Sequence, residues 1–270
     1  MVEGTLHVDG CDLHYMEEGR GEPVVLVPAA GSDSTTWGDA RTELARDHRV
    51  IVYDRRGYRR SAFDGAPSLA RHAQDVAALI EHLDAAPAIV AGISVGATIT
   101  LELAIERPDL VRTAVLYEVP LHAKRSTDFA AARTFMRVAK MTKRGDLAGA
   151  GVFFLRWAYR YPDGSSAFDR MPRAWQDVAT NNAVALLNDL KIATAEKTIS
   201  MRDVRNLRVP AQCIVGEKSH RAMRGFVRRA AKAIPDSKLV VLPGAAHAGA
   251  FDQPLAFADQ IRRASSGARV

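Results

Sequence analysis

Ser94 lies in the pentapeptide Gly92-Ile93-Ser94-Val95-Gly96, whose residue types and spacing can support nucleophilic chemistry. A serine hydroxyl is a weak nucleophile near pH 7, so it needs a base and a backbone that projects its Oγ. A sharp turn from a strand into a helix provides that projection, and small flanking residues fit the crowded turn. An apolar strand pattern precedes the pentapeptide and a helical pattern follows it. We predict that Ser94 is the nucleophile of an acyl transfer; the alternative is a serine in an ordinary tight turn.

His247 follows the last apolar run of the chain and is the predicted general base. It would take the proton of Ser94 and later return a proton to the leaving group. Of the 8 histidines, no other follows a late strand end so closely. His220 is the nearest competitor, and it is either a surface residue or a substrate contact.

Short apolar runs without polar alternation recur along the chain and predict strands that are buried on both faces, as in a parallel sheet. These runs lie at residues 24–27, 50–53, 88–91, 114–117, 213–215 and 239–242. Before them, residues 5–8 and 13–16 flank an Asp-Gly turn and predict a strand pair. Helical patterns lie between the runs, at residues 68–83, 99–105, 221–233 and 254–263. This alternation predicts an α/β fold with a doubly wound, mostly parallel sheet.

The strand rhythm stops after Pro120 and resumes near Val209, and the segment between them is rich in helical patterns. We expect residues 1–120 and 206–270 to form the core, and residues 121–205 to form an inserted helical cap, or lid. The cap segment holds 15 Lys and Arg against 8 Asp and Glu, a net charge of +7, and the whole chain carries +6. The excess indicates either a solvated helical surface or a basic mouth that favours an anionic substrate.

Composition narrows the class of protein. With 270 residues, 47% of them hydrophobic and 25% charged, the chain can bury a sizeable core. It has no apolar run of the roughly 18 residues that a membrane span needs and no signal-peptide pattern at its start. Cys11 and Cys213 are expected to be free thiols in a reducing cytoplasm. We expect no nucleic-acid or membrane partner, no metal and no cofactor; the oligomeric state stays open, with a homodimer as one option.

The pentapeptide around Ser94, His247 and the stretch Asp54-Arg55-Arg56-Gly57 together resemble the α/β-hydrolase superfamily. The likeness covers almost the whole chain and is weakest in the cap. It implies a catalytic triad of serine, histidine and an acidic residue.

The acid departs from the family's common pattern. Members often place it three residues beyond the glycine that ends the next-to-last strand, and that position here is Ser219, which cannot ionise. Some members use the end of the strand after the nucleophile helix, where this chain has Glu118. We therefore expect Glu118 to be the acid, with Glu217 or a serine–histidine dyad as alternatives. The arrangement distantly resembles that of zearalenone lactonases.

Two preorganised N–H donors should bind the oxyanion that acyl transfer creates. The resemblance implies that Val95 supplies one and that the loop after residues 24–27 supplies the other. Many relatives have His-Gly in that loop, whereas this chain has Pro28-Ala29, and proline has no N–H. We expect Ala30 to be the second donor, with Gly31 as the alternative.

Aromatic residues of the cap are candidates for a pocket wall. The predicted substrate contacts are Trp157, Tyr159 and Trp175 with Gly31, although at this spacing some belong to the core of the cap. The turn at residues 54–61 carries Arg59 where relatives usually have glycine, which we interpret as a matter of surface packing. A phosphate site on its four arginines is an alternative, but the glycine-rich cradle and its lysine are absent.

These residues favour a serine hydrolase that cleaves a small-molecule carboxylic ester or lactone through an acyl-enzyme. One alternative keeps the triad and changes the bond, as in a C–C bond hydrolase or a cofactor-free perhydrolase. Another is a non-enzymatic protein of this fold that binds a small ligand under its cap.

Overall fold

Eight strands form one sheet in the order β1-β2-β4-β3-β5-β6-β7-β8. The computed structural model describes residues 1–121, 129–195 and 199–266. The strands are β1 (Val2–Val8), β2 (Cys11–Glu18), β3 (Glu22–Val27), β4 (His48–Tyr53), β5 (Ala88–Ile93), β6 (Val111–Tyr117), β7 (Ala211–Gly216) and β8 (Ser237–Leu242). The pairings β1–β2 and β2–β4 are antiparallel and all others are parallel. The predicted α/β fold with a mostly parallel sheet is confirmed.

The central strands are buried on both faces, which explains why their sequences are continuous apolar runs. In β3, residues Val24 to Val27 are fully shielded from solvent. β8 differs, because it lies at the edge of the sheet, where Leu239 is 43% and Val241 is 48% exposed. The expectation that this last run is buried on both faces was therefore wrong.

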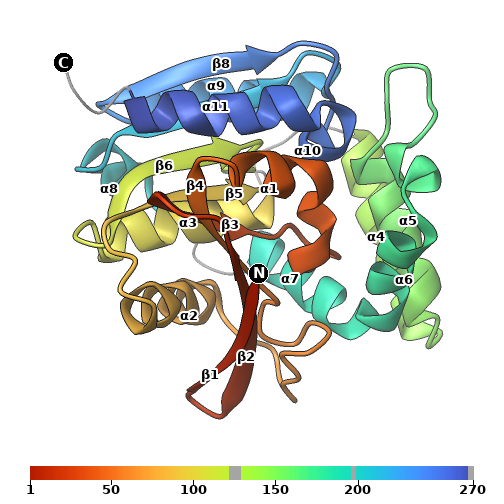
Figure 1. Ribbon diagram of the computed structural model, residues 1–270. Coiled ribbons are helices and arrows are strands. Elements are labelled where there is room, and N and C mark those ends of the chain that lie inside the picture. The colour runs from red at the N-terminus through yellow and green to blue at the C-terminus, as the bar shows by residue number, and fades with distance from the viewer. Residues whose placement is uncertain (122–128, 196–198, 267–270) are drawn as a thin grey trace.

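Helices cover both faces of the sheet (Figure 1). They are η1 (Ser34–Trp37), α1 (Gly38–Leu44), α2 (Leu69–His82), α3 (Val95–Glu106), α9 (Arg221–Ala233), α10 (Gly249–Asp252) and α11 (Pro254–Ser266). Apolar residues of α2, α3 and α9 join one core cluster, and those of α1 and α11 join the cluster on the opposite face. Because the strands from β4 to β8 are parallel, their carboxyl ends lie at one edge of the sheet. This edge is where α/β sheets bind ligands.

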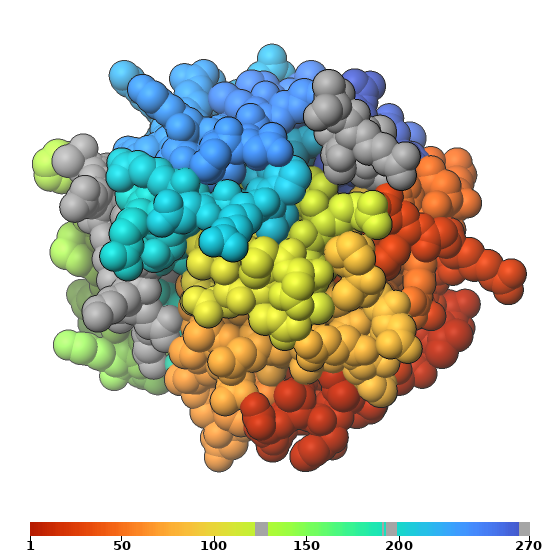
Figure 2. Space-filling view, turned by 90° about the vertical axis from the view of Figure 1, so that its left-hand side faces the viewer, coloured from red at the N-terminus to blue at the C-terminus, as the bar shows by residue number. Residues whose placement is uncertain are grey.

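The described parts of the chain between β6 and β7 are mainly helical. Its elements are α4 (Phe129–Lys143), α5 (Leu147–Ala158), η3 (Ala167–Arg170), α6 (Arg173–Asn181), α7 (Ala183–Ala195) and α8 (Met201–Arg205). α4, α5 and α6 stand together at the right of Figure 1, and their apolar residues join a cluster that also includes residues of α7 and of the loop after β8. Figure 2 looks at the left-hand side of that view, where the green segment stays at one edge. That residues 121–205 act as a lid stays a prediction.

In the part of the chain that the structure describes, no helix combines the length and apolar character that crossing a membrane requires.

Candidate active site

Ser94 lies at the turn between β5 and α3, with φ of 56° and ψ of −118°. This backbone conformation is rare for a residue with a side chain and indicates a strained turn. Glycine is required on both sides: a Cβ at Gly92 would collide with the backbone of Gly96, and one at Gly96 with that of Val27. The turn therefore requires a glycine two residues before Ser94 and another two residues after it. Ser94 itself stays partly exposed at the end of the strand.

Glu118 and His247 meet at the same edge of the sheet. Glu118 directly follows β6, its side chain is 0% exposed, and its Oε2 lies 2.6 Å from Nδ1 of His247. His247 lies in the loop after β8 and is 8% exposed, so little water competes for this contact. A carboxylate bound to Nδ1 orients the imidazole and leaves Nε2 to act as the base. The structure brings these two predicted residues together across 129 positions of sequence.

Ser219 completes the surroundings of this carboxylate. Its Oγ donates a short hydrogen bond to Oε1 of Glu118, and the N–H of Gly216 donates to the same oxygen at 2.9 Å. The position where the acid was expected from the resemblance therefore supplies a donor to Glu118, the acid predicted in its place. The sequence marked Ser219 only as a missing acid; its hydroxyl, three residues beyond a strand-end glycine, was the signal that could have predicted the contact.

The competing residues lie elsewhere. Glu217 is exposed and accepts a hydrogen bond from the N–H of Gly244 at 2.9 Å. His220 stacks on Trp157, with ring centroids 6.0 Å apart. In the described part of the chain, Ser94 Oγ and His247 form no hydrogen bond, which is common for catalytic pairs in the absence of substrate.

Ala30 and Val95 offer the two backbone donors expected for an oxyanion. Within residues 1–121, 129–195 and 199–266, neither N–H has a hydrogen-bond acceptor. Gly31, the alternative donor, gives its N–H to the hydroxyl of Tyr58 at 3.1 Å, so it is already engaged. The geometry therefore favours Ala30 over Gly31.

A buried ion pair fixes the loop that carries Ala30. Arg55 is 0% exposed and pairs with both oxygens of Asp189 on α7, at 3.0 and 2.6 Å. The same guanidinium donates to the carbonyl of Ala29 at 3.0 Å, and Tyr58 donates to Asp189. Burial opposes the charge of Arg55, but the Asp189 carboxylate outweighs it and raises the pKa of Arg55.

The phosphate alternative for the arginine-rich turn was wrong, whereas Arg59 itself lies exposed at the surface, as the surface-packing interpretation of its substitution expects. Each of its four guanidinium groups pairs with a carboxylate: Arg55 with Asp189, Arg56 with Asp75, Arg59 with Asp33, and Arg60 with Asp54. Arg59 adopts a φ of 42°, the left-handed conformation that explains the glycine of relatives. These side chains bind the turn to its neighbours and leave no free cationic cradle.

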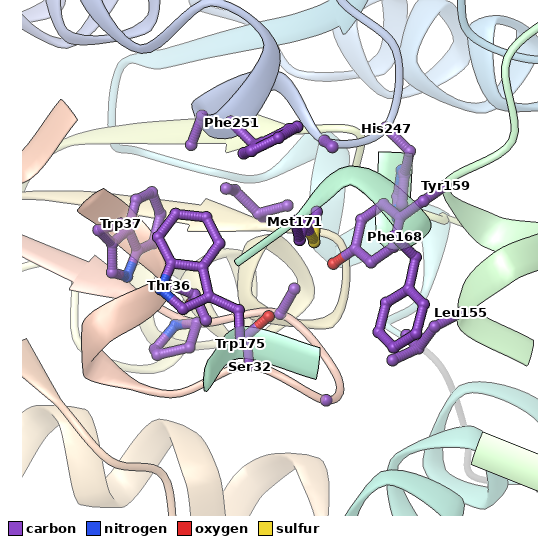
Figure 3. A pocket seen from close by; sticks show the side chains of 16 residues that line it. Ser32, Thr36, Trp37, Leu155, Tyr159, Phe168, Met171, Trp175, His247 and Phe251 are labelled. Carbon is purple, nitrogen blue, oxygen red and sulfur yellow. The ribbon is translucent and has the colours of Figure 1, made fainter. Parts of the chain in front are cut away.

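An apolar cavity lies beside His247 (Figure 3). Its side-chain lining includes Ile93, Leu155, Tyr159, Phe168, Met171, Trp175 and Phe251, and Gly31 contributes backbone. Three of the predicted contacts, Gly31, Tyr159 and Trp175, thus line it. Trp157 does not, because its ring packs against Phe135, Phe154 and His220.

Tyr159 gives this cavity a polar group next to His247. Its ring lies 5.4 Å from that of His247, centroid to centroid, and burial raises the pKa of Tyr159. The phenol therefore stays neutral and can donate a hydrogen bond. Among the described residues, no group of three or more His, Cys, Asp and Glu side chains is arranged to hold a metal ion.

Fold and site together define a class of protein. The sequence model of the alpha/beta hydrolase family matches residues 24–260, and the chain belongs to that family. The chain is 29% identical over 260 residues to BpoC of Mycobacterium tuberculosis, whose name is that of a non-heme bromoperoxidase; the match covers 90% of this chain and 93% of BpoC.

Solved structures share the fold. A thermophilic esterase from Thermogutta terrifontis superposes with a TM-score of 0.82 at 22% identity and covers 100% of both chains. The enol-lactonase from Burkholderia xenovorans superposes with a TM-score of 0.78 at 21% identity, over 97% of this chain and 100% of the other. At these identities the likeness concerns the fold alone.

Proposed function

We propose that this chain is a serine hydrolase that cleaves a carboxylic ester or lactone through an acyl-enzyme on Ser94. The observation that carries the proposal is the buried contact of Glu118 with His247 Nδ1 at 2.6 Å, at the sheet edge where Ser94 stands on its strained turn. A histidine held in this way has its second nitrogen available to a serine hydroxyl.

The reaction would begin when His247 Nε2 takes the proton of Ser94 and Oγ attacks the substrate carbonyl. The N–H groups of Ala30 and Val95 would bind the oxyanion, a contribution worth about 10²–10³ in rate for each donor. His247 would then protonate the leaving alcohol, and a water deprotonated by the same nitrogen would release the acid from Ser94. Throughout, the Glu118 carboxylate would stabilise the imidazolium.

The cavity supports a substrate with an apolar portion. Aromatic and aliphatic side chains form most of its wall, and Tyr159, whose hydroxyl forms a hydrogen bond with that of Ser32, lies next to His247. Such a wall binds through burial of apolar surface, and a few polar groups set the orientation. Lactones fit this description as well as open esters, in keeping with the resemblance to zearalenone lactonases.

Replacement of Ser94 tests the proposal directly. Ser94→Ala should lower kcat for p-nitrophenyl esters and aromatic lactones by about 10⁴-fold or more, because no other group takes the acyl intermediate. A fluorophosphonate probe should label wild type and Ser165→Ala, an exposed serine of the loop after α5, but not Ser94→Ala. Labelling that persists in Ser94→Ala would show that another nucleophile acts. No labelling and no turnover in wild type, with tight ligand binding, would favour a non-enzymatic binder.

The name of BpoC favours one second candidate, a perhydrolase on the same triad. Hydrogen peroxide in place of water would attack the acyl-enzyme, which releases a peracid and restores the Ser94 hydroxyl. Ester turnover in the presence of peroxide should then yield peracid, detected by oxidation of bromide, in wild type but not in Ser94→Ala. Carboxylic acid as the sole product at high peroxide would contradict this candidate and leave the hydrolase proposal intact.

A further inference from the structure

A second, charged groove opens between the loop after α5 and the start of α9. Its volume is about 460 Å³, and it shares no lining residue with the apolar cavity. Four of the side chains that line it are cations: Arg160 comes from the loop after α5, Lys218 from the turn after β7, and Arg221 and Arg224 from the first turns of α9. We call this feature the basic groove.

These cations lack the carboxylate partners that many other described arginines have. Within the described ranges 1–121, 129–195 and 199–266, none of the four forms an ion pair, in contrast to the arginines of the turn at residues 54–61. Of the neighbouring acids, Asp163 accepts from Ser165 and also attracts Lys218 through its charge, and Glu217 accepts from Gly244 N–H. The groove therefore holds four cations, and Asp163 offsets only part of this positive charge.

The start of α9 adds to this charge. The helix has 13 residues, and its N-cap residue, His220, makes no side-chain hydrogen bond to the first turn. Free N–H groups at a helix start carry a partial positive charge and bind anions, above all phosphate. Arg221 and Arg224, three residues apart, project from the same side of this turn.

We propose that the basic groove is a binding site for a small molecule that carries a phosphate or pyrophosphate group. Guanidinium groups form paired hydrogen bonds with phosphate oxygens, and the α9 N–H groups would complete the contact. Ser219, which also lines the groove, donates its hydroxyl to Glu118. The basic groove is separate from the apolar cavity. It is linked to the proposed triad acid, Glu118, through a single residue, Ser219.

Isothermal titration of the full chain with inorganic pyrophosphate tests this site. Wild type should bind one equivalent saturably at low salt, and added salt should weaken binding. The double variant Arg221→Gln, Arg224→Gln should bind at least about tenfold more weakly, since it removes two charge-assisted contacts. Arg228→Gln, an exposed position of the same helix outside the groove, is the matched control and should stay within about twofold of wild type.

A second variant, Arg160→Gln with Lys218→Gln, removes cations from the other two elements and should weaken binding similarly. Titrations with inorganic phosphate and with adenosine diphosphate distinguish a free oxyanion from the tail of an organic molecule, and either result supports the site. Absence of saturable binding by wild type to all three probes would overturn the proposal. So would an equal loss of affinity in Arg228→Gln, or tighter binding of succinate than of any phosphate probe.

Discussion

The Glu118 carboxylate is held by donors on both oxygens. One oxygen accepts from Gly216 N–H and Ser219 Oγ, and the other lies against His247 Nδ1. A fully buried carboxylate is costly unless such donors surround it, so the site is built for an acid at this position. The φ of 51° at Glu118 is rare for a residue with a side chain, and such strained conformations cluster at functional sites.

Glu118→Gln should lower kcat by about 10³–10⁴-fold, because an amide neither stabilises the imidazolium nor fixes the required tautomer. The matched variant Glu217→Gln removes an exposed carboxylate in the neighbouring strand-end turn and should keep activity within about twofold of wild type. Steady-state kinetics on one p-nitrophenyl ester checks both variants. If Glu217→Gln were the more damaging change, the proposed acid would be wrong.

The sequence allowed prediction of residues that lie in motifs or at predicted strand ends. It did not allow prediction of contacts between side chains that are far apart in the sequence. Ser94, His247 and Glu118 were predicted because each follows an apolar run at a strand end, and parallel strands bring such ends to one edge. The contact of Ser219 with Glu118 joins positions 101 apart, and its one signal in the sequence, a hydroxyl three residues beyond a strand-end glycine, was interpreted only as a missing acid. Trp157 was taken for a pocket residue because aromatic content alone cannot tell which side of a helix faces the cavity.

At the scale of elements, α7 is connected to the loop that presents Ala30. Asp189 on α7 binds Arg55 and Tyr58, and these two bind Ala29 O and Gly31 N–H on either side of Ala30. The helical segment after β6 therefore reaches the proposed oxyanion site through a buried, charged network. Sequence could not predict this link, because Arg55 and Asp189 are 134 residues apart.

Asp189→Asn should lower kcat more than it changes KM, since the loop that presents Ala30 N–H would lose its support. Loss of one oxyanion donor costs about 10²–10³ in rate, and a displaced donor should cost part of that. A weakened buried ion pair should also lower the free energy of unfolding by about 2–4 kcal/mol. Kinetics and urea unfolding measure the two effects separately.

Asp75→Asn provides the control for that variant. Asp75 forms an equally buried pair with Arg56, but Arg56 donates to the carbonyls of Val8 and Asp9 at the far strand pair. The Asp75→Asn variant should lose a similar amount of unfolding free energy and keep the kcat of wild type. Equal losses of kcat in the two variants would mean that Asp189 acts on stability alone.

At the scale of the whole molecule, the sheet was predictable because burial on both faces leaves a plain signature, a run of apolar residues between turns. The exception, β8, shows the limit: its run is as apolar as the others, yet it lies at an edge where Leu239 and Val241 meet solvent. The sequence pattern shows which residues of a strand are apolar. Whether those residues are buried depends on the position of the strand in the sheet. The helical segment after β6 was predicted from the break in this rhythm, but its packing was not.

The core beneath the site also holds a histidine that should make the fold sensitive to acid. His72 on α2 is 1% exposed, and neither ring nitrogen has a hydrogen-bond partner among the described residues. Burial, assisted by the charge of Arg55, lowers the pKa of His72 from 6.5 to about 3. Between pH 6.5 and about pH 3, His72 binds a proton in the unfolded chain but not in the folded chain. The free energy of unfolding therefore falls as pH falls through this range.

His72→Leu should therefore flatten the dependence of stability on pH. The free energy of unfolding of wild type should fall by up to about 1.4 kcal/mol more per pH unit than that of the variant between pH 6 and pH 4. Urea unfolding at pH 7, 6, 5 and 4 measures both slopes. His82→Gln, at the exposed last turn of the same helix, should keep the slope of wild type. Identical slopes in wild type and His72→Leu would mean that the folded core takes up the proton, in which case the acid sensitivity has its origin in the paired carboxylates.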